Sequence, residues 1–179
     1  MENLVHQDLN FIDDIFLAVP NWSIYRENSN RILSQKSDNP LGLNINRRDL
    51  IYIEMAKVWS KNSYCKRMQV GCLIVSNKSI ISDGYNGTPT GFPNCCEDEN
   101  NQTLPLVLHA EANAITKLAK SNQSSAGSTL YVTLSPCFEC SKLIIQAGIK
   151  RLVFTEVYRN PEPISFLAQS GIEIIKLTI

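Results

Sequence analysis

The sequence predicts an α/β protein in which helices pack against one mixed sheet. After a first helical segment and two adjacent strands, segments with helical spacing alternate three times with short runs rich in β-branched residues. Such alternation places helices against a sheet that contains parallel strands. The composition, 44% hydrophobic and 19% charged, is typical of a globular domain that builds its own core.

The first helix of the domain is predicted over residues 46–61. Asn46 is a suitable N-cap, because its side chain can accept a hydrogen bond from the first turn. Leu50, Ile53 and Val58 recur at helical spacing and are expected to place apolar side chains mainly on one face.

A β-hairpin and a long loop are predicted next. The run QVGCLIV at residues 69–75 is rich in β-branched residues and indicates a strand. Residues 76–78 form a turn, and residues 79–82 are the expected antiparallel partner. Residues 83–105 are crowded with Gly, Pro, Asn and acidic residues, which indicates a loop. A loop of this length inside a compact domain is usually functional or disordered.

The second half of the chain alternates helix and strand. Pro136 suits the first turn of the second of its helices, and Gly148 suits the end of that helix. The predicted elements, in chain order, are a helix over 108–120, a strand over 129–134, a helix over 137–147, a strand over 151–155, a helix over 164–169 and a strand over 172–177.

Residues 1–46 are predicted to form an N-terminal extension, and residues 47–179 the domain itself. In the extension, apolar positions such as Leu9 and Phe16 favour a short helix that ends at Pro20. No apolar run reaches the roughly 18 residues that a membrane span needs. The acidic N-terminus also lacks the positive region of a secretory signal. We therefore expect a cytoplasmic protein with no membrane partner.

Charge and cysteine content narrow the function further. The chain has 17 basic and 17 acidic residues, so its formal net charge is zero. A basic surface spread over the whole chain, as polynucleotide-binding proteins often show, is therefore not expected. Six cysteines in a cytoplasmic chain indicate metal binding or catalysis before disulfides.

Two short segments, HAE and PCFEC, hold the residues with the most specific chemistry. One imidazole, His109, and two thiolates, Cys137 and Cys140, make a three-ligand zinc set with a fourth position open for water. Cys137 and Cys140 are three residues apart at a predicted helix start, so their sulfurs face the same side and the helix N-terminus favours the thiolate forms. Glu111 can reach that water and move its protons without being a ligand.

The alternative for these segments is a structural zinc knuckle. A knuckle needs a second pair of Cys or His ligands at similar spacing. The only histidines in the chain are His6 and His109, so the required pair is difficult to find. Cys72 lies in the middle of a predicted strand and is expected to be a small buried hydrophobe.

The H-x-E and P-C-x-x-C segments follow the pattern of zinc-dependent nucleobase deaminases. Longer stretches, namely HAEANAI, GYNGTPTGF and LYVTLSPCFECSKLIIQAGIKRLVF, resemble the deoxycytidylate (dCMP) deaminase family over residues 50–177. The resemblance implies a cytidine-deaminase-like fold, a three-layer α/β/α sandwich with a five-stranded mixed sheet. It also implies hydrolytic deamination of dCMP to dUMP and ammonia, which supplies dUMP for thymidylate synthesis.

The resemblance also implies substrate contacts. Asn86 is expected near the sugar and base, and Tyr158 is expected to pack against the substrate. Ala110, which lies between the zinc ligand and the proton carrier, is also expected to contact the substrate. Lys66 and Arg67 are close cations that, with their backbone amides, can hold the 5′-phosphate. Each residue has a plainer alternative: Asn86 as a turn residue with positive φ, Tyr158 as edge packing, and the cations as a solvated turn.

The expected cofactor is one catalytic Zn²⁺ per chain. Cys65, Cys95 and Cys96 match cysteines that hold a second, structural zinc in some relatives, although the insert here is short and lacks histidine, so free cysteines remain an alternative. The resemblance further implies a homo-oligomer, typically a hexamer, regulated by dCTP and dTTP with Mg²⁺.

Two other functions stay open. One is a deaminase of another nucleoside, nucleotide or pterin-type substrate. The GYNG segment and the neutral charge argue against transfer RNA, and nucleoside enzymes more often have Cys at the position of His109. The other is a non-catalytic zinc-binding module that senses nucleotides. Such a module needs no proton carrier at Glu111.

Overall fold

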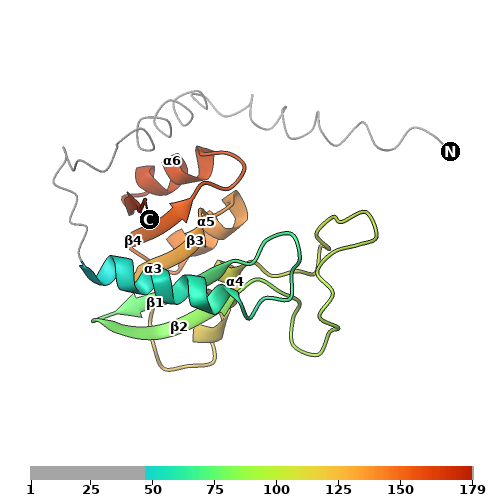
Figure 1. Cartoon of the computed structure of the whole chain (residues 1–179). Coiled ribbons are helices and arrows are strands. Elements are labelled where there is room, and N and C mark those ends of the chain that lie inside the picture. Colours follow the sequence, from blue (N-terminus) through green and yellow to red (C-terminus); the bar gives the residue numbers. More distant parts are fainter. Residues whose placement is uncertain (1–46, 179) are drawn as a thin grey trace.

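The computed structural model describes residues 47–178, which form three layers (Figure 1). The N-terminal extension predicted for residues 1–46 lies outside the described residues. In chain order the elements are α3 (Arg47–Ser60), β1 (Gly71–Ser76), β2 (Ser79–Tyr85), α4 (Ala110–Leu118), β3 (Thr129–Leu134), α5 (Phe138–Gln146), β4 (Arg151–Glu156), α6 (Glu162–Gln169) and β5 (Glu173–Lys176).

The five strands form one mixed sheet in the order β2-β1-β3-β4-β5. β1 is antiparallel to both β2 and β3, whereas β3, β4 and β5 run parallel. α5 joins β3 to β4 and α6 joins β4 to β5, because parallel neighbours need a crossover connection, which is usually a helix. The predicted five-stranded mixed sheet is therefore confirmed.

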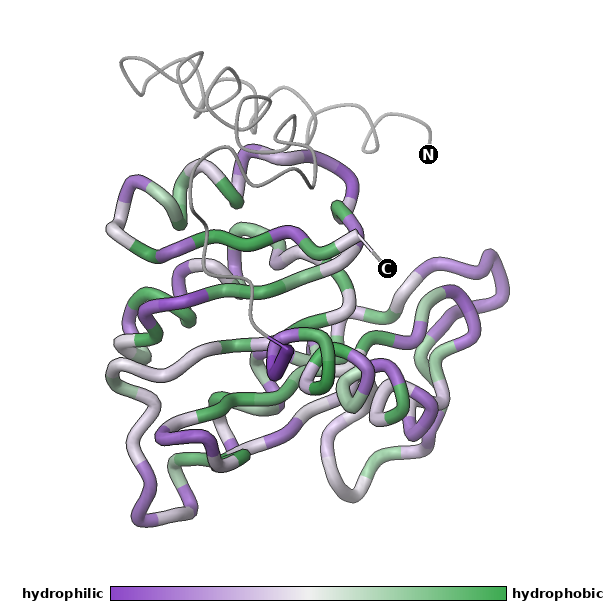
Figure 2. The backbone as a smooth tube through the Cα atoms, turned by 60° about the vertical axis from the view of Figure 1, so that its left-hand side comes forward, coloured by the Kyte–Doolittle hydropathy of each residue, from purple (hydrophilic) through white to green (hydrophobic). Residues whose placement is uncertain are grey.

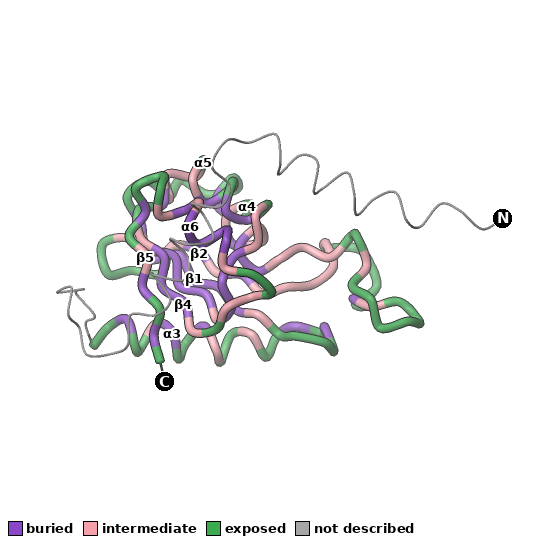
Figure 3. Tube along the Cα trace, turned by 90° about the horizontal axis from the view of Figure 1, so that it is seen from above, coloured by how far each residue is buried: buried purple, intermediate pink, exposed green. Residues whose placement is uncertain are grey.

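Side chains on the strands alternate between two apolar cores. Cys72 and Ile74 belong to the core under α4, α5 and α6, and both are fully buried. Leu73 and Val75 belong to the core under α3. Figure 3 shows α3 on one side of the sheet and the other three helices on the opposite side, and Figure 2 shows hydrophobic stretches along the central strands. The burial predicted for Cys72 is confirmed.

α3 packs on the sheet with a different face from the one predicted. Its buried side chains are Asp49, Ile53 and Ala56, whereas Leu50 and Val58 are 40% and 62% exposed. The prediction was wrong because apolar residues surround much of this helix, so their spacing does not single out one face. The polar Asp49 lies on the buried face because the sheet supplies hydrogen-bond donors to it.

The hairpin between β1 and β2 turns at Asn77 and Lys78, whose φ angles of 50° and 67° are those of a tight two-residue turn. β2 continues to Tyr85, beyond its predicted end, because Asp83 still pairs with Leu73 of β1. The polar and glycine residues at this end of the strand led the sequence analysis to assign them to the loop.

The long loop after β2 projects from the body of the domain (Figure 1). Two isolated bridges brace it, between Gly87 and Leu108 and between Glu97 and Thr103. The first bridge returns the chain to the sheet edge just before α4, so the start of α4 lies beside the end of β2. Among the described residues, every helix is too short or too polar to cross a lipid bilayer.

Candidate active site

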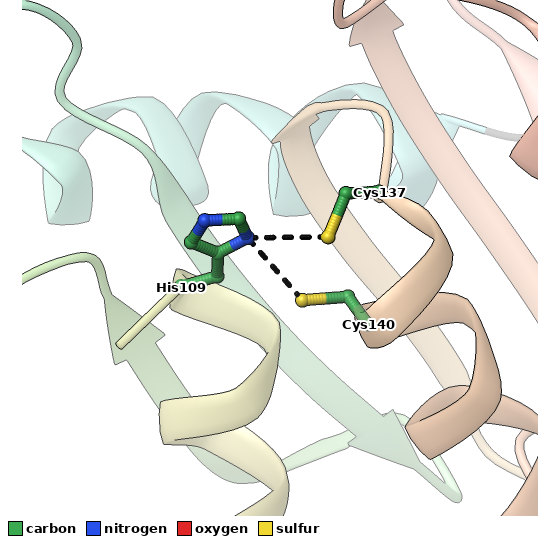
Figure 4. Close-up of side chains that lie close together, drawn as sticks. All are labelled: His109, Cys137 and Cys140. Carbon is green, nitrogen blue, oxygen red and sulfur yellow. Dashed lines mark hydrogen bonds between the residues drawn. The ribbon is translucent and has the colours of Figure 1, made fainter. Parts of the chain in front are cut away.

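His109, Cys137 and Cys140 meet at the starts of two neighbouring helices (Figure 4). His109 is the N-cap of α4, Cys137 is the N-cap of α5, and Cys140 lies in the first turn of α5. Nδ1 of His109 lies 3.4 Å from Sγ of Cys137 and 3.5 Å from Sγ of Cys140. The structure thus brings His109 together with two cysteines that follow it by 28 and 31 residues.

The spacing of these donor atoms fits a zinc ion. With bond lengths of about 2.0 Å to nitrogen and 2.3 Å to sulfur, tetrahedral zinc places these two ligand atoms about 3.5 Å apart. All three donor atoms lie within 4.8 Å of one another, and within residues 47–178 no other His, Cys, Asp or Glu group meets that condition. One imidazole and two thiolates leave a fourth position for water or substrate.

The two thiols differ in proton affinity. A hydrogen bond with Cys140 lowers the pKa of Cys137 to about 4, and the same interaction raises the pKa of Cys140. The hydrogen bond to Cys137 also raises the pKa of His109. The lowered pKa and the position of Cys137 at the N-terminus of α5 both favour the thiolate, which is the form that ligates a metal.

Glu111 lies in the first turn of α4 with 4% of its surface exposed. In the metal-free protein, burial raises the pKa of Glu111 to about 7. A carboxyl group with a pKa near neutrality can both accept a proton and return it. Glu111 follows Ala110 in the chain, and both residues line the pocket beside the donor cluster. This position suits a proton carrier.

β2 fixes the position of α4, and with it the imidazole and the carboxylate. Gly84 is essential to this contact, because a Cβ atom there would lie only 2.1 Å from the carbonyl oxygen of Ala110. The hydroxyl of Ser82 donates to the carbonyl of Ala114 at 2.6 Å, and Nδ2 of Asn113 donates to the carbonyl of Tyr85 at 3.0 Å. The end of the strand thus holds the first two turns of the helix.

A pocket opens beside the donor cluster. Of the predicted substrate contacts, Asn86, Arg67, Tyr158 and Ala110 line it, and Lys66 does not. The lining residues come from the start of α4, the end of β3 and the loops around them: Cys65, Arg67, Met68, Val70, Asn86, Glu97, Thr103, Val107, His109, Ala110, Glu111, Leu134, Ser135, Cys137 and Tyr158.

The Asn86 side chain braces the segment that leads into β1. Its Oδ1 accepts from the backbone N–H of Val70 at 2.8 Å, and its Nδ2 donates to the carbonyl of Met68 at 2.9 Å. Its φ is not positive, so the alternative of a left-handed turn residue is not what the structure shows. The amide retains a second N–H and a second lone pair, with which it can contact a ligand.

The backbone amides of Lys66 and Arg67 already hold a carboxylate. Oε1 of Glu97 accepts from the N–H of Lys66 at 2.9 Å and from that of Arg67 at 3.2 Å. Nη1 of Arg67 donates to the hydroxyl of Thr103 at 3.1 Å. The amides that the sequence analysis offered to a phosphate are therefore occupied by Glu97. Sequence reasoning missed this residue because the composition of a loop gives no contact partner.

Tyr158 lies against the donor cluster at the end of β4. Its ring meets the imidazole of His109 edge to face, with 6.5 Å between centroids. Its backbone N–H donates to the hydroxyl of Ser135 at 2.8 Å, and the N–H of Ser135 donates to the carbonyl of Glu156 at 2.8 Å. The guanidinium of Arg159 stacks on the Tyr158 ring, 4.9 Å from its centroid. Neither Ser135 nor Arg159 was predicted from the sequence as part of the site.

Of the remaining predicted cysteines, Cys65 lines the pocket. Cys65 and Cys96 are paired as a disulfide, with 5.1 Å between their Cα atoms. Cys95 is exposed, and its thiol contacts the carbonyl of Glu97 at 3.3 Å. The described residues contain no cluster of metal donors that includes these cysteines. The second zinc therefore stays a prediction.

Known proteins share this fold and these segments. Residues 46–156 match the family model of the cytidine and deoxycytidylate deaminase zinc-binding region. The chain is 33% identical over 168 residues to deoxycytidylate deaminase of Enterobacteria phage T4, covering 70% of this chain and 87% of the relative. It is 34% identical over 136 residues to deoxycytidylate deaminase of Saccharomyces cerevisiae, covering 70% of this chain but 43% of that longer protein.

The fold is also that of a solved relative. The crystal structure of dCMP deaminase from the cyanophage S-TIM5, in complex with dCMP and dUMP, superposes with a TM-score of 0.72 and 46% identity, covering 75% of this chain and all of that one. The cytidine-deaminase-like fold expected from the sequence is thereby confirmed. Since the matched region contains the whole His109, Cys137 and Cys140 cluster together with Glu111, the chain belongs to the cytidine and deoxycytidylate deaminase family.

Proposed function

We propose that this chain catalyses the zinc-dependent hydrolysis of dCMP to dUMP and ammonia, which supplies dUMP for thymidylate synthesis. The observation that carries the proposal is the convergence of His109, Cys137 and Cys140 beside the buried Glu111 at one pocket. The likeness to a dCMP deaminase whose crystal structure contains dCMP and dUMP supports this choice of substrate.

The residues divide the chemistry between them. His109, Cys137 and Cys140 would hold Zn²⁺, which lowers the pKa of a water molecule and so provides a nucleophile near neutral pH. Glu111 would take one proton from that water and deliver it to N3 of the cytosine ring. It would then move the second proton of the same oxygen to the departing amine, so that the C4–O bond forms and the C4–N bond breaks. The water oxygen becomes the C4 carbonyl of dUMP, and ammonia leaves with the original nitrogen.

Other pocket residues orient the nucleotide. The Tyr158 ring packs against the base, and Ala110 closes the pocket beside the zinc ligands. Asn86 contacts the sugar and base through the amide donor that its backbone bonds leave free. Arg67 approaches the phosphate from the pocket wall, whereas the Lys66 side chain contributes only charge, because it does not line the pocket.

An ultraviolet assay of the purified, zinc-loaded protein tests the proposal. We expect dCMP to be deaminated with the highest kcat/KM among dCMP, deoxycytidine, cytidine, dCTP and a pterin precursor. Equal kcat/KM values for dCMP and deoxycytidine would contradict a nucleotide enzyme. Full zinc loading with no turnover of any of these compounds would favour the nucleotide-sensing module instead.

The assembly and regulation of the enzyme are part of the proposal. We expect a homo-oligomer, a hexamer by resemblance, that acts in the cytoplasm and responds to dCTP and dTTP with Mg²⁺. A second hollow between the loop after β2 and α4 is bordered by Lys117, whose Nζ pairs with Asp83 at 2.7 Å, and by Lys120, which offers a cation to a triphosphate. Sedimentation and dCMP turnover with each effector, with and without Mg²⁺, are the measurements. A monomer with unchanged rates would contradict both expectations.

A further inference from the structure

We propose that Arg159 is a specificity-determining residue, whose guanidinium binds the 5′-phosphate of the nucleotide at the mouth of the pocket. The inference rests on the proposed function and deepens it. For the reaction to occur, the amine of dCMP must lie at the zinc ligands. The phosphate is at the other end of the nucleotide and must therefore lie toward the pocket mouth. A cation at that mouth separates a nucleotide from a nucleoside.

Arg159 does not itself line the pocket, but its guanidinium lies beside a residue that does. Tyr158 lines the pocket, and its ring is the aromatic partner of the imidazole of His109. The guanidinium carbon of Arg159 lies over this same ring, 4.9 Å from its centroid. A guanidinium can contact a ring through its face and still use its in-plane N–H donors for a phosphate. Within the described part of the chain, that guanidinium makes no hydrogen bond or ion pair, so its donors are available to a ligand.

The other anion-binding groups near the pocket are already engaged. The backbone amides of Lys66 and Arg67 hold the carboxylate of Glu97, and Nη1 of Arg67 donates to Thr103. Glu97 itself lines the pocket and repels a phosphate placed beside it. A phosphate dianion therefore needs a further cation besides Arg67. Among the described residues, Arg159 is the cation that stacks on a pocket-lining side chain.

The backbone at Arg159 is held in a disfavoured conformation. Its φ of +46° lies in the left-handed region. Of the four described non-glycine residues with positive φ, two form the hairpin turn and a third is an asparagine, which tolerates this region, whereas Arg159 has neither explanation. The hydrogen bond from Tyr158 to Ser135 fixes the preceding residue, and Pro161 caps α6 just beyond. Such local strain, held by its surroundings, is typical of binding sites.

Kinetics on dCMP and deoxycytidine test the role of Arg159. In Arg159→Ala we expect kcat/KM for dCMP to fall about tenfold or more, through KM, because a charged hydrogen bond to phosphate is lost. The value for deoxycytidine, which has no phosphate, should stay within about twofold. Inorganic phosphate should also inhibit the variant less than the wild type. A purely structural role would change both substrates together.

Two further variants keep the test decisive. Arg159→Gly suits the left-handed backbone, so it removes the guanidinium while preserving the turn. Lys150→Ala removes an equal charge from the opposite end of β4 and should leave the ratio of the two substrates unchanged. An unchanged ratio in zinc-loaded Arg159→Gly would overturn the inference. If the wild type deaminates neither substrate, the proposed function fails. The inference is then tested by calorimetric binding: dCMP must bind more tightly than deoxycytidine, and Arg159→Gly must abolish that difference in affinity.

Discussion

Glu111 and His109 are two residues apart on one helix, yet the proposed chemistry gives them separable roles. Glu111→Gln keeps the shape of the side chain but removes its capacity to carry a proton. We expect the variant to retain about one zinc per chain and to lose at least about a hundredfold in kcat on dCMP. His109→Ala and Cys137→Ser should lose zinc as well. Metal analysis with turnover measurements distinguishes the two classes, and near-normal turnover in Glu111→Gln would refute the mechanism.

The burial of Glu111 also predicts how the metal-free protein responds to pH. Its pKa rises from 4.5 to about 7 on folding, so the folded state holds this proton more tightly than the unfolded chain. The resulting stability is fully present below pH 4.5 and is lost as the pH rises through 7. We expect metal-free wild type to lose roughly 2.5 kcal/mol more than Glu111→Gln between pH 5 and 8 in urea unfolding. Parallel losses in the two proteins would contradict this.

The donor cluster was predictable from sequence because it is built from two short motifs, and the spacing within each motif is local. An H-x-E segment and a C-x-x-C segment, each at a helix start, already specify which side chains face one another once the helices are adjacent. Glu97 and Arg159 were not predictable. Glu97 reaches backbone amides 30 residues away, and the aromatic stacking of Arg159 depends on the conformation of one turn. Composition and periodicity carry no information about such contacts.

At the scale of elements, the contact between β2 and α4 should be sensitive to a single methyl group. In Gly84→Ala the new Cβ would lie 2.1 Å from the carbonyl oxygen of Ala110 and 2.7 Å from the N–H of Ala114, so the helix must move. We expect a loss of about 1 to 3 kcal/mol in unfolding free energy, with weaker zinc binding. Gly87→Ala is the matched control, since nothing lies within 4 Å of its added Cβ. Equal stability of the two variants would contradict the close approach.

The cysteines at 65, 95 and 96 allow two arrangements that exclude each other, because the disulfide and the predicted second zinc both use Cys65 and Cys96. With the disulfide, we expect about one zinc per chain and four reactive thiols in the denatured, metal-free protein. Two zincs and six thiols would support the second metal instead. Cys95→Ser tests the remaining predicted ligand: it should change neither zinc content nor stability if the disulfide is present.

The order of helices and strands was predictable because each segment has a clear period, whereas the end of β2 and the buried face of α3 were not. β2 extends to Tyr85 because hydrogen bonds to β1 outweigh the loop-like composition of its last residues. α3 buries Asp49 because partners elsewhere in the chain satisfy it: the hydroxyl of Tyr131 donates at 2.7 Å, and Arg151 donates to both carboxylate oxygens at 2.7 and 2.9 Å. Periodicity cannot find a buried charge whose partners lie in distant strands.

At the scale of the whole molecule, residues 47–178 contain both cores of the sheet and all proposed zinc ligands. A shortened chain that begins at Asn44 is therefore expected to fold and bind zinc as the full chain does. α3, at the start of this domain, exposes apolar side chains, among them Ile51, Val58 and Trp59. Apolar positions of the predicted extension, such as Phe16, are expected to pack against the domain or a neighbouring subunit.

Deletion of the extension should therefore affect solubility or assembly more than the metal site. We expect the shortened chain to keep about one zinc, to melt within a few degrees of the full chain, and to bind more of a hydrophobic dye, because an exposed apolar surface is left uncovered. Replacing Val58, the most exposed of these α3 residues, with Lys in the shortened chain should reverse the dye binding without changing zinc content. Loss of zinc or precipitation of both shortened proteins would show that the extension belongs to the core and that the predicted boundary at residue 46 is wrong.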